Sequence, residues 1–237
     1  MKFVVKHHIG NVREINEDYY YATEHSPLYI VADGMGGHLA GEIASQTAVT
    51  VIEEALSSDF SQPVELSGDI QNAVEAANKK VYDLSVADLS KRGMGTTLSL
   101  VYVKDDVLYF TNVGDSRIYS KGAEFKQLTV DDSYVNYLVT IGEITKEEAQ
   151  NHPKKNIITR ALGTTASLNV AVQHLDWKEQ SIDKLLLCSD GLSNMVGDEI
   201  LSILLEKDSD SAANELLQLA LDSGGLDNIT FIIIDLK

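Results

Sequence analysis

The sequence predicts an α+β protein in which helices cover antiparallel β-sheets. Two observations support this fold class. Apolar runs of strand length follow one another through hairpin-like turns, and longer segments with apolar residues at helical spacing lie between the groups of strands. Strands and helices do not alternate regularly, so a parallel sheet built from strand–helix–strand units is not expected.

One domain is expected for residues 1–237. The chain is 44% hydrophobic, which is ample for a well-buried core, and it contains only three prolines. No Pro/Gly/Ser-rich linker, low-complexity tract or internal repeat divides it. Residues 131–161 differ from the rest because they consist of polar helical pieces, and we expect them to form a small inserted subdomain.

In the first half of the chain, short apolar or alternating runs indicate strands, and apolar stripes indicate two long amphipathic helices. The turn-like Lys104-Asp105-Asp106 joins two strands into a hairpin. The helices are expected within 41–56 and 70–84, and the strands at 3–6, 19–22, 28–32, 96–103, 107–113, 117–120 and 125–128.

The second half begins with the polar helical pieces. One helix is expected at 133–141, and Thr145 with Glu148 has the spacing of a capping box that opens another. Residues 168–175 alternate like a half-exposed strand. Further strands are expected at 184–189 and 229–235, and helices at 197–205 and 211–223.

Composition restricts the partners and the compartment. A net charge of −17 argues against nucleic acid and against an anionic membrane, since both require a cationic face. The single Cys188 excludes an internal disulfide and fits a reducing compartment, where it is expected to be a buried small hydrophobe. No signal-peptide core and no run of eighteen apolar residues is present, so we expect a soluble, cytoplasmic protein.

Four separated stretches share one pattern, in which an apolar strand meets an aspartate beside glycine and a small polar residue. A single strand that ends in Asp-Gly is usually an ordinary turn. Several such carboxylates at one edge of the sheets would repel each other and would require cations. Oxygen ligands without a histidine pair favour Mg²⁺ or Mn²⁺ over zinc. The aspartates are Asp33, Asp115, Asp190 and Asp227, and Asp18 is a fifth acid that leads into a strand.

Two further residues are candidates for chemistry. Arg13 is one of only four arginines, and its planar guanidinium suits a phosphate group, although an exposed loop arginine is usually just solvated. His38 is the only histidine in the Gly-rich loop that begins at Gly34. It could protonate a leaving group, or it could be an ordinary surface residue.

Seven motifs, in this order and spacing, resemble those of bacterial PPM-family (type 2C) serine/threonine protein phosphatases, and the resemblance covers nearly the whole chain. The motifs are Gly10-Asn11-Val12-Arg13 with Asn16-Glu17-Asp18, the segment 31–42, Gly93-Met94-Gly95-Thr96-Thr97, the segment 113–117, Ala161-Leu162-Gly163, Ser189-Asp190-Gly191-Leu192 and the segment 225–230.

This resemblance implies a central antiparallel β-sandwich flanked by helices on both faces, with a flap subdomain at about residues 131–161. It also implies a centre of two or three Mn²⁺ or Mg²⁺ ions. Asp33 would bridge the first two ions, and Asp190 and Asp227 would bind the first. The Gly34 carbonyl, with a water held by Asp18, would serve the second ion, and Asp115 with Asp190 would hold a third.

The implied reaction is hydrolysis of phosphoserine or phosphothreonine by metal-activated water, without a phosphoenzyme. Arg13 would hold the phosphate, and His38 would lie at the place of the family's general acid. The substrates would be phosphoproteins, among them a cognate serine/threonine kinase, and the chain would act as a monomer.

One motif departs from the family, because Asp131-Asp132-Ser133 stands where many relatives have Asp-His-Ser. No metal ligand is lost, so flap position and substrate choice are affected more than activity. Two alternatives stay open. One is a pseudophosphatase that binds phosphoproteins, which would be expected to lack a ligand; the other is a two-metal hydrolase of small phosphate esters.

Overall fold

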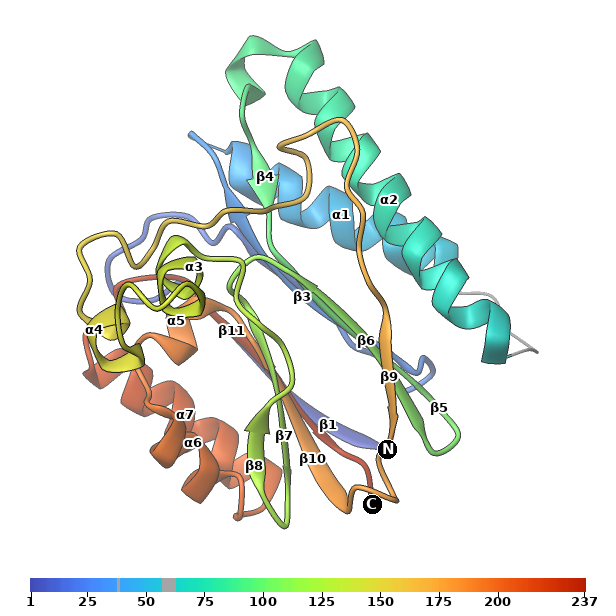
Figure 1. Cartoon of the computed structure of the whole chain (residues 1–237), viewed down its shortest axis with the longest axis vertical. Helices are drawn as coiled ribbons and strands as arrows, with labels where there is room; N and C mark the ends of the chain where they lie inside the picture. The colour runs from blue at the N-terminus through green and yellow to red at the C-terminus, as the bar shows by residue number, and fades with distance from the viewer. Residues whose placement is uncertain (38, 57–62) are drawn as a thin grey trace.

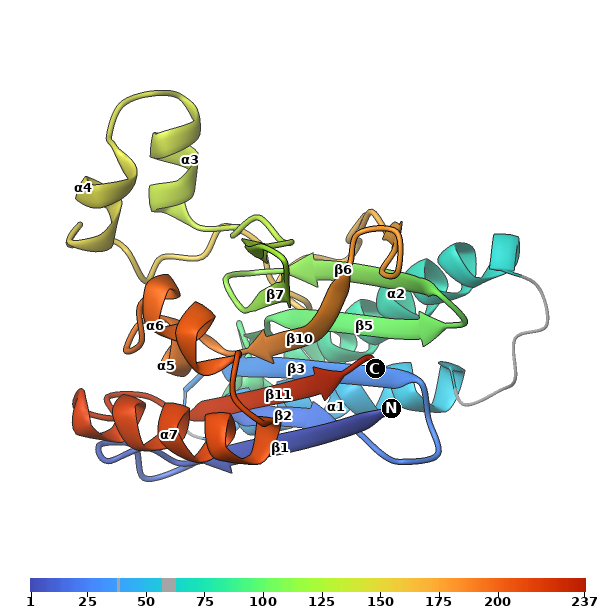
Figure 2. The same cartoon turned by 90° about the horizontal axis from the view of Figure 1, so that it is seen from below.

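The computed structural model describes residues 1–37, 39–56 and 63–237, and its centre is a pair of antiparallel sheets packed face to face (Figures 1 and 2). The first sheet has the order β1 (Lys2–His8), β11 (Ile229–Asp235), β10 (Ile182–Cys188), β7 (Arg117–Gly122), β8 (Phe125–Gln127). The second has the order β2 (Asp18–Tyr21), β3 (Leu28–Met35), β5 (Leu98–Lys104), β6 (Val107–Val113), β9 (Gln173–Asp176), and β4 (Gly95–Thr96) also pairs with β3.

The central strands are apolar on both faces because each face is covered. In β10, Leu185 and Leu187 point into the space between the sheets, whereas Leu186 and Cys188 point to the opposite side. This is the period of two that a pleated strand imposes. Cys188 is therefore buried, as expected, and burial raises the pKa of its thiol to about 12.

Helices cover the outer face of each sheet. The second sheet is covered by α1 (Ala40–Leu56) and α2 (Pro63–Ala87), which pack together and against β3. A short helix, η1 (Leu89–Lys91), follows α2. The first sheet is covered by α5 (Asp190–Ser193), α6 (Asp198–Leu204) and α7 (Ser209–Asp222) (Figure 1). The prediction of a four-layer αββα sandwich is confirmed.

One predicted strand is wrong in its extent. Residues 168–172 are irregular, and β9 begins only at Gln173, opposite Phe110. The alternating Leu168, Val170 and Val172 instead pack on the core beneath α1 and α2. Their alternation therefore reflects burial of one side of an extended segment and not pairing in the sheet.

Residues between β8 and β9 form two short helices, α3 (Tyr134–Thr140) and α4 (Lys146–Gln150), that project from the sandwich (Figure 2). The predicted capping box is present, since Thr145 Oγ1 accepts from the Glu148 N–H and the Glu148 carboxylate accepts from the Thr145 N–H. Within the described part of the chain, no helix is long and apolar enough to cross a membrane.

Candidate metal centre

Strand register brings the predicted aspartates to one end of the sandwich. Asp18 at the start of β2 lies opposite Asp33 in β3. In the other sheet, Cys188 at the end of β10 lies opposite both Arg117 in β7 and Phe231 in β11. Asp115, Asp190 and Asp227 are close in sequence to these strand ends. They therefore gather at the same end of the sandwich as Asp18 and Asp33.

The five carboxylates act on one another through charge. Burial raises the pKa of Asp33 well above its ordinary value, and the charges of Asp18, Asp190, Asp115 and Asp227 raise it further. Burial likewise raises the pKa of Asp18 and of Asp115 to about 7 and that of Asp190 to about 6, with neighbouring aspartates adding to each rise. Ionising all of them at neutral pH is therefore costly unless positive charge is supplied.

Buried oxygens without hydrogen-bond partners show where that charge would fit. Asp18 accepts from Ser189 Oγ (2.8 Å) with Oδ2, and Asp190 accepts from Asn194 Nδ2 (2.9 Å) with Oδ2. The second oxygen of each, Oδ1, is buried and has no partner. A buried carboxylate oxygen that no donor reaches is costly, and a cation would relieve that cost.

The chemical type of these side chains indicates the kind of metal ion. Across residues 1–37, 39–56 and 63–237, no group of three or more His, Cys, Asp or Glu side chains forms a ready-made cage for a metal. The mutual shifts in pKa nonetheless show that the aspartates share one electrostatic site. Carboxylate oxygens suit Mg²⁺ or Mn²⁺, which keep several water ligands.

Glu17 is a further member of the site that the sequence analysis did not single out. Its Oε1 is buried without a partner, and burial raises the pKa of the carboxyl. The Glu17 carbonyl accepts from the Gly34 N–H (3.1 Å) and from Ser45 Oγ (2.6 Å), so the residue is held beside Gly34. Glu17 lies next to the predicted Asp18 in one motif, but only the burial of its side chain distinguishes it from a solvated acid.

Gly34 and Gly41 allow this close approach. A Cβ atom at Gly34 would lie 2.1 Å from the Gly41 carbonyl oxygen, and one at Gly41 would lie 2.2 Å from Glu17 Oε1. Any side chain at either position would push apart β3, α1 and the segment that carries Glu17. Gly34 thus holds the segment of Glu17 and the start of α1 close to Asp33.

Arg13 lies at the exposed rim of the cluster. Its Nη2 donates to Asp227 Oδ2 at 2.8 Å, and this bond raises the pKa of the guanidinium, with added effects from Glu17 and Asp33. The predicted phosphate-binding arginine is therefore in contact with a predicted metal ligand. His38, the other predicted catalytic residue, lies outside the described residues.

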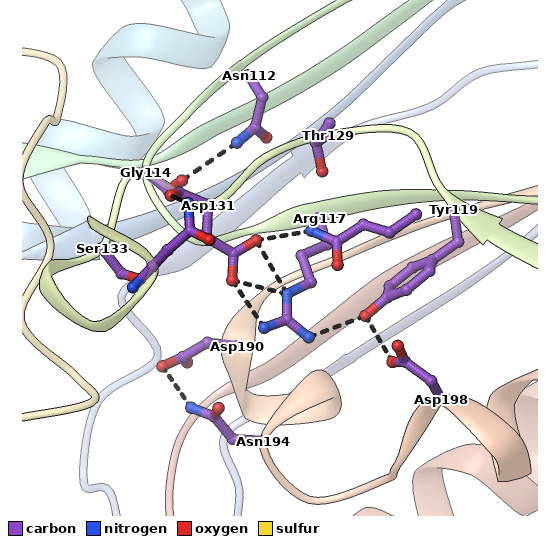
Figure 3. Close-up of polar contacts among 12 residues, drawn as sticks. Asn112, Gly114, Arg117, Tyr119, Thr129, Asp131, Ser133, Asp190, Asn194 and Asp198 are labelled. Carbon is purple, nitrogen blue, oxygen red and sulfur yellow. Dashed lines mark hydrogen bonds and ion pairs between the residues drawn. The ribbon is translucent and has the colours of Figure 1, made fainter. Parts of the chain in front are cut away.

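A partly buried network is built around Arg117, two residues after Asp115 (Figure 3). Arg117 donates through Nη2 to Asp131 Oδ2 (2.7 Å) and through Nε to both Asp131 oxygens, and its Nη1 donates to the Tyr119 hydroxyl (3.0 Å). Tyr119 in turn donates to Asp198 Oδ1 (3.1 Å). The donors of Arg117 are thus directed to Asp131 and Tyr119, so a simple Arg117–Asp115 ion pair does not explain Asp115.

The same region anchors residues 131–161. The Asp132 N–H donates to the Gly114 carbonyl (2.8 Å), and the Gly114 N–H donates to Asp132 Oδ2 (3.2 Å). Arg160, at the other end of the segment, pairs with Asp132 (3.3 Å). Asp132, the residue that departs from the family motif, therefore joins both ends of this segment to the turn that carries Asp115.

Comparisons with known proteins agree with this geometry. The family model for protein phosphatase 2C matches residues 6–222. A serine/threonine phosphatase, Stp, of Listeria monocytogenes is 38% identical over 95% of this chain and 92% of its own length. The crystal structure of the Mycobacterium tuberculosis serine/threonine phosphatase PstP/Ppp superimposes with a TM-score of 0.92 at 34% identity, covering 100% of this chain and 98% of that one.

A structure of the catalytic domain of PstP holds two manganese ions and superimposes with a TM-score of 0.87 at 34% identity, over 99% of this chain and 97% of that chain. The family model alone spans far more than half of the sequence. This chain therefore belongs to the protein phosphatase 2C family.

Proposed function

We propose that this protein hydrolyses phosphoserine and phosphothreonine in phosphoproteins, with two or three Mn²⁺ or Mg²⁺ ions held by the aspartate cluster. As a member of the 2C family it is a metal-dependent serine/threonine phosphatase. The observation that carries the assignment of the site is the set of buried, unpartnered carboxylate oxygens at one end of the sandwich, next to an exposed arginine.

The proposed ligand roles follow the order of the elements. Asp33, whose pKa the other four aspartates all raise, would bridge two ions. Asp190 and Asp227 would hold the first ion, and Gly34 and Asp18 would serve the second, with Glu17 beside them. Asp115 with Asp190 would hold a third. When bound, the ions lower the pKa of water and neutralise charge on the phosphoryl oxygens.

The side chains around the ions orient the substrate and the ligands. Arg13 would bind the phosphoryl oxygens through a charge-assisted bond and would have to share its Nη2 contact with Asp227. Asn194 donates to one carboxylate oxygen of Asp190, and Ser189 donates to one carboxylate oxygen of Asp18. The other oxygen of each aspartate is left for the metal ions. His38 would be the proton donor to the leaving hydroxyl group.

The partners and the setting are part of the same proposal. Substrates would include a serine/threonine kinase whose phosphorylation this protein opposes, and the chain would act in the cytoplasm. A monomer is supported by the helices, which cover the outer face of both sheets and leave neither sheet face for a second copy. A pseudophosphatase would be expected to lack a ligand, but all five predicted aspartates are present and gathered together.

Asp33→Asn provides the main test, with a phosphothreonine peptide as the substrate and Mn²⁺ present or absent. Wild type should be active only with the metal, and the variant should lose activity on the order of 100-fold or more, because it removes the bridging charge. Asp183→Asn is the matched control, since Asp183 has a buried oxygen outside the centre and pairs with Lys237. A folded Asp33→Asn protein with near-wild-type turnover would refute the proposed centre.

The ions should compete with protons. Asp18, Asp115 and Asp190 have pKa values of about 7, 7 and 6 in the metal-free fold, above those of an unfolded chain. The folded state therefore binds more protons between about pH 4 and 7, and its stability should fall as pH rises through this window. Mn²⁺ affinity should rise over the same window and level off above about pH 7.

Calorimetric melting of the metal-free protein across this range measures the first effect, and Mn²⁺ titration at each pH measures the second. Asp18→Asn should make both dependences shallower, because one of the titrating groups is gone. Equal melting temperatures at both ends of the range, in wild-type protein without metal, would contradict the crowding of the carboxylates.

Arg13→Ala should raise KM for a phosphopeptide about tenfold, with a smaller loss of kcat, because the arginine contacts phosphate in both the ground state and the transition state. Stability should change little, since the Arg13–Asp227 pair is exposed. Arg92→Ala, at an exposed arginine near η1, is the control and should leave KM unchanged. An unchanged KM in Arg13→Ala would show that Arg13 is only a solvated loop residue.

Asp115→Ala tests the number of ions. The variant should fold, bind one Mn²⁺ fewer than wild type in a calorimetric titration, and lose most activity towards phosphopeptides, since the outer ion has few protein ligands. Asp132→His changes the base of the flap but no proposed ligand, so it should keep the wild-type stoichiometry while altering preference among protein substrates. Identical stoichiometry in Asp115→Ala and wild type would eliminate Asp115 as a ligand.

A further inference from the structure

His7 in β1 has no part in the proposed reaction, yet it lies one hydrogen bond away from the residues that hold Asp18. Its Nδ1 is 2.9 Å from Thr230 Oγ1, and its Nε2 is 3.1 Å from Asn16 Nδ2. His7 is exposed, but its bond to Thr230 is partly buried, and its ring lies 5.3 Å from the ring of Tyr20. Both ring nitrogens are therefore engaged by side chains of other segments.

The direction of these bonds follows from one backbone group. The Asp18 N–H donates to Asn16 Oδ1 at 3.1 Å, and a backbone N–H can only donate. This contact orients the Asn16 amide so that its NH₂ group faces His7, and an NH₂ group also can only donate. Nε2 of His7 must therefore accept, which makes the ring neutral and leaves the proton on Nδ1.

The protonated Nδ1 then donates to Thr230 Oγ1, so the hydroxyl hydrogen of Thr230 must point elsewhere. A hydrogen bond from the Thr230 side chain is one of the influences that lower the pKa of Asp18. The Thr230 N–H also donates to Ser189 Oγ (3.1 Å), and Ser189 Oγ donates to Asp18 Oδ2 (2.8 Å). His7 is therefore linked to the Asp18 carboxylate through Thr230 and Ser189. It is also linked to the Asp18 N–H through Asn16.

This chain of bonds is shielded from water near Asp18. Thr230 and Ser189 are fully buried, and Asp18 is 2% exposed. The donors leave Asp18 Oδ1 without a partner, and that oxygen is the one available to the centre. Burial, with a smaller contribution from His8, lowers the pKa of His7, which agrees with the neutral ring that the geometry requires.

We propose that His7 is a positioning residue for the metal centre: its neutral Nδ1–H form holds Thr230 and Asn16 in place. Thr230 acts on the Asp18 carboxylate through Ser189, and Asn16 accepts from the Asp18 N–H, so that Oδ1 of Asp18 is turned towards the second ion. The inference rests on the proposed function for the identity of that ion. Residues that orient metal ligands commonly contribute 10- to 100-fold to metal affinity.

Three substitutions separate this role from simple packing. His7→Phe keeps a ring beside Tyr20 but removes both nitrogens, whereas His7→Asn keeps a donor close to the position of Nδ1. His174→Phe is the control, because His174 is an exposed histidine in β9, away from the aspartates. Mn²⁺ titrations of the full chain by calorimetry, at one fixed pH, compare all four proteins.

We expect His7→Phe to weaken Mn²⁺ binding at one inner site about tenfold, with the other sites unchanged, and His7→Asn to restore most of that affinity. His174→Phe should match wild type. The apparent Mn²⁺ requirement for phosphopeptide hydrolysis should rise in parallel in His7→Phe, and kcat should recover at saturating Mn²⁺. Equal Mn²⁺ affinity in His7→Phe and wild type would overturn the inference.

Nitrogen-15 NMR of the wild-type imidazoles gives a second readout that does not depend on a variant folding. We expect the neutral tautomer with the proton on Nδ1 of His7, both in the metal-free protein and with diamagnetic Mg²⁺. A proton on Nε2, or a charged ring, would overturn the inference. Failure of wild type to hydrolyse phosphopeptides, with the metal and NMR results as expected, would instead count against the proposed function alone.

Discussion

The mutual repulsion of five clustered aspartates is the constraint on which the rest of this structure depends. The fold brings these carboxylates to one end of a sandwich and leaves one buried oxygen of Asp18 and one of Asp190 without donors. At neutral pH such an arrangement lowers the stability of the fold unless cations are supplied. The same feature that makes the metal-free centre costly therefore creates its affinity for ions, so folding, metal binding and phosphatase activity are coupled.

The sandwich can stay folded despite this repulsion because its central strands are buried on both sides. Leu185 and Leu187 pack between the sheets, and Leu186 packs beneath the helices, so each central strand contributes apolar surface twice. Asp33 lies in the paired backbone of β3, and Asp190 begins α5 directly after β10, so both carboxylates are attached to regular elements. A flexible loop would let the carboxylates separate and would lose the site.

Hydrogen-bond networks on two sides hold the ligands in place. On one side, Arg117 joins β7 to Asp131 and, through Tyr119, to the first turn of α6. Because residues 131–161 begin at that aspartate, the position of the flap is tied to the strand that follows Asp115. On the other side, hydrogen bonds run from His7 through Thr230 and Ser189 to Asp18. Ligand orientation is thus distributed over segments that are distant in sequence.

Local patterns in the sequence determined much of this molecule. Alternation, helical stripes and Asp-Gly strand ends predicted the fold class, most elements and the five aspartates, because each signal depends on neighbours along the chain. The strand expected at 168–175 was wrong in extent, since alternation reports burial and not pairing. Only the tertiary structure singled out Glu17, the Arg13–Asp227 contact and the hydrogen bonds of His7. These features depend on partners from distant segments. Neither local propensity nor spacing along the chain encodes which side chains meet when two sheets pack together.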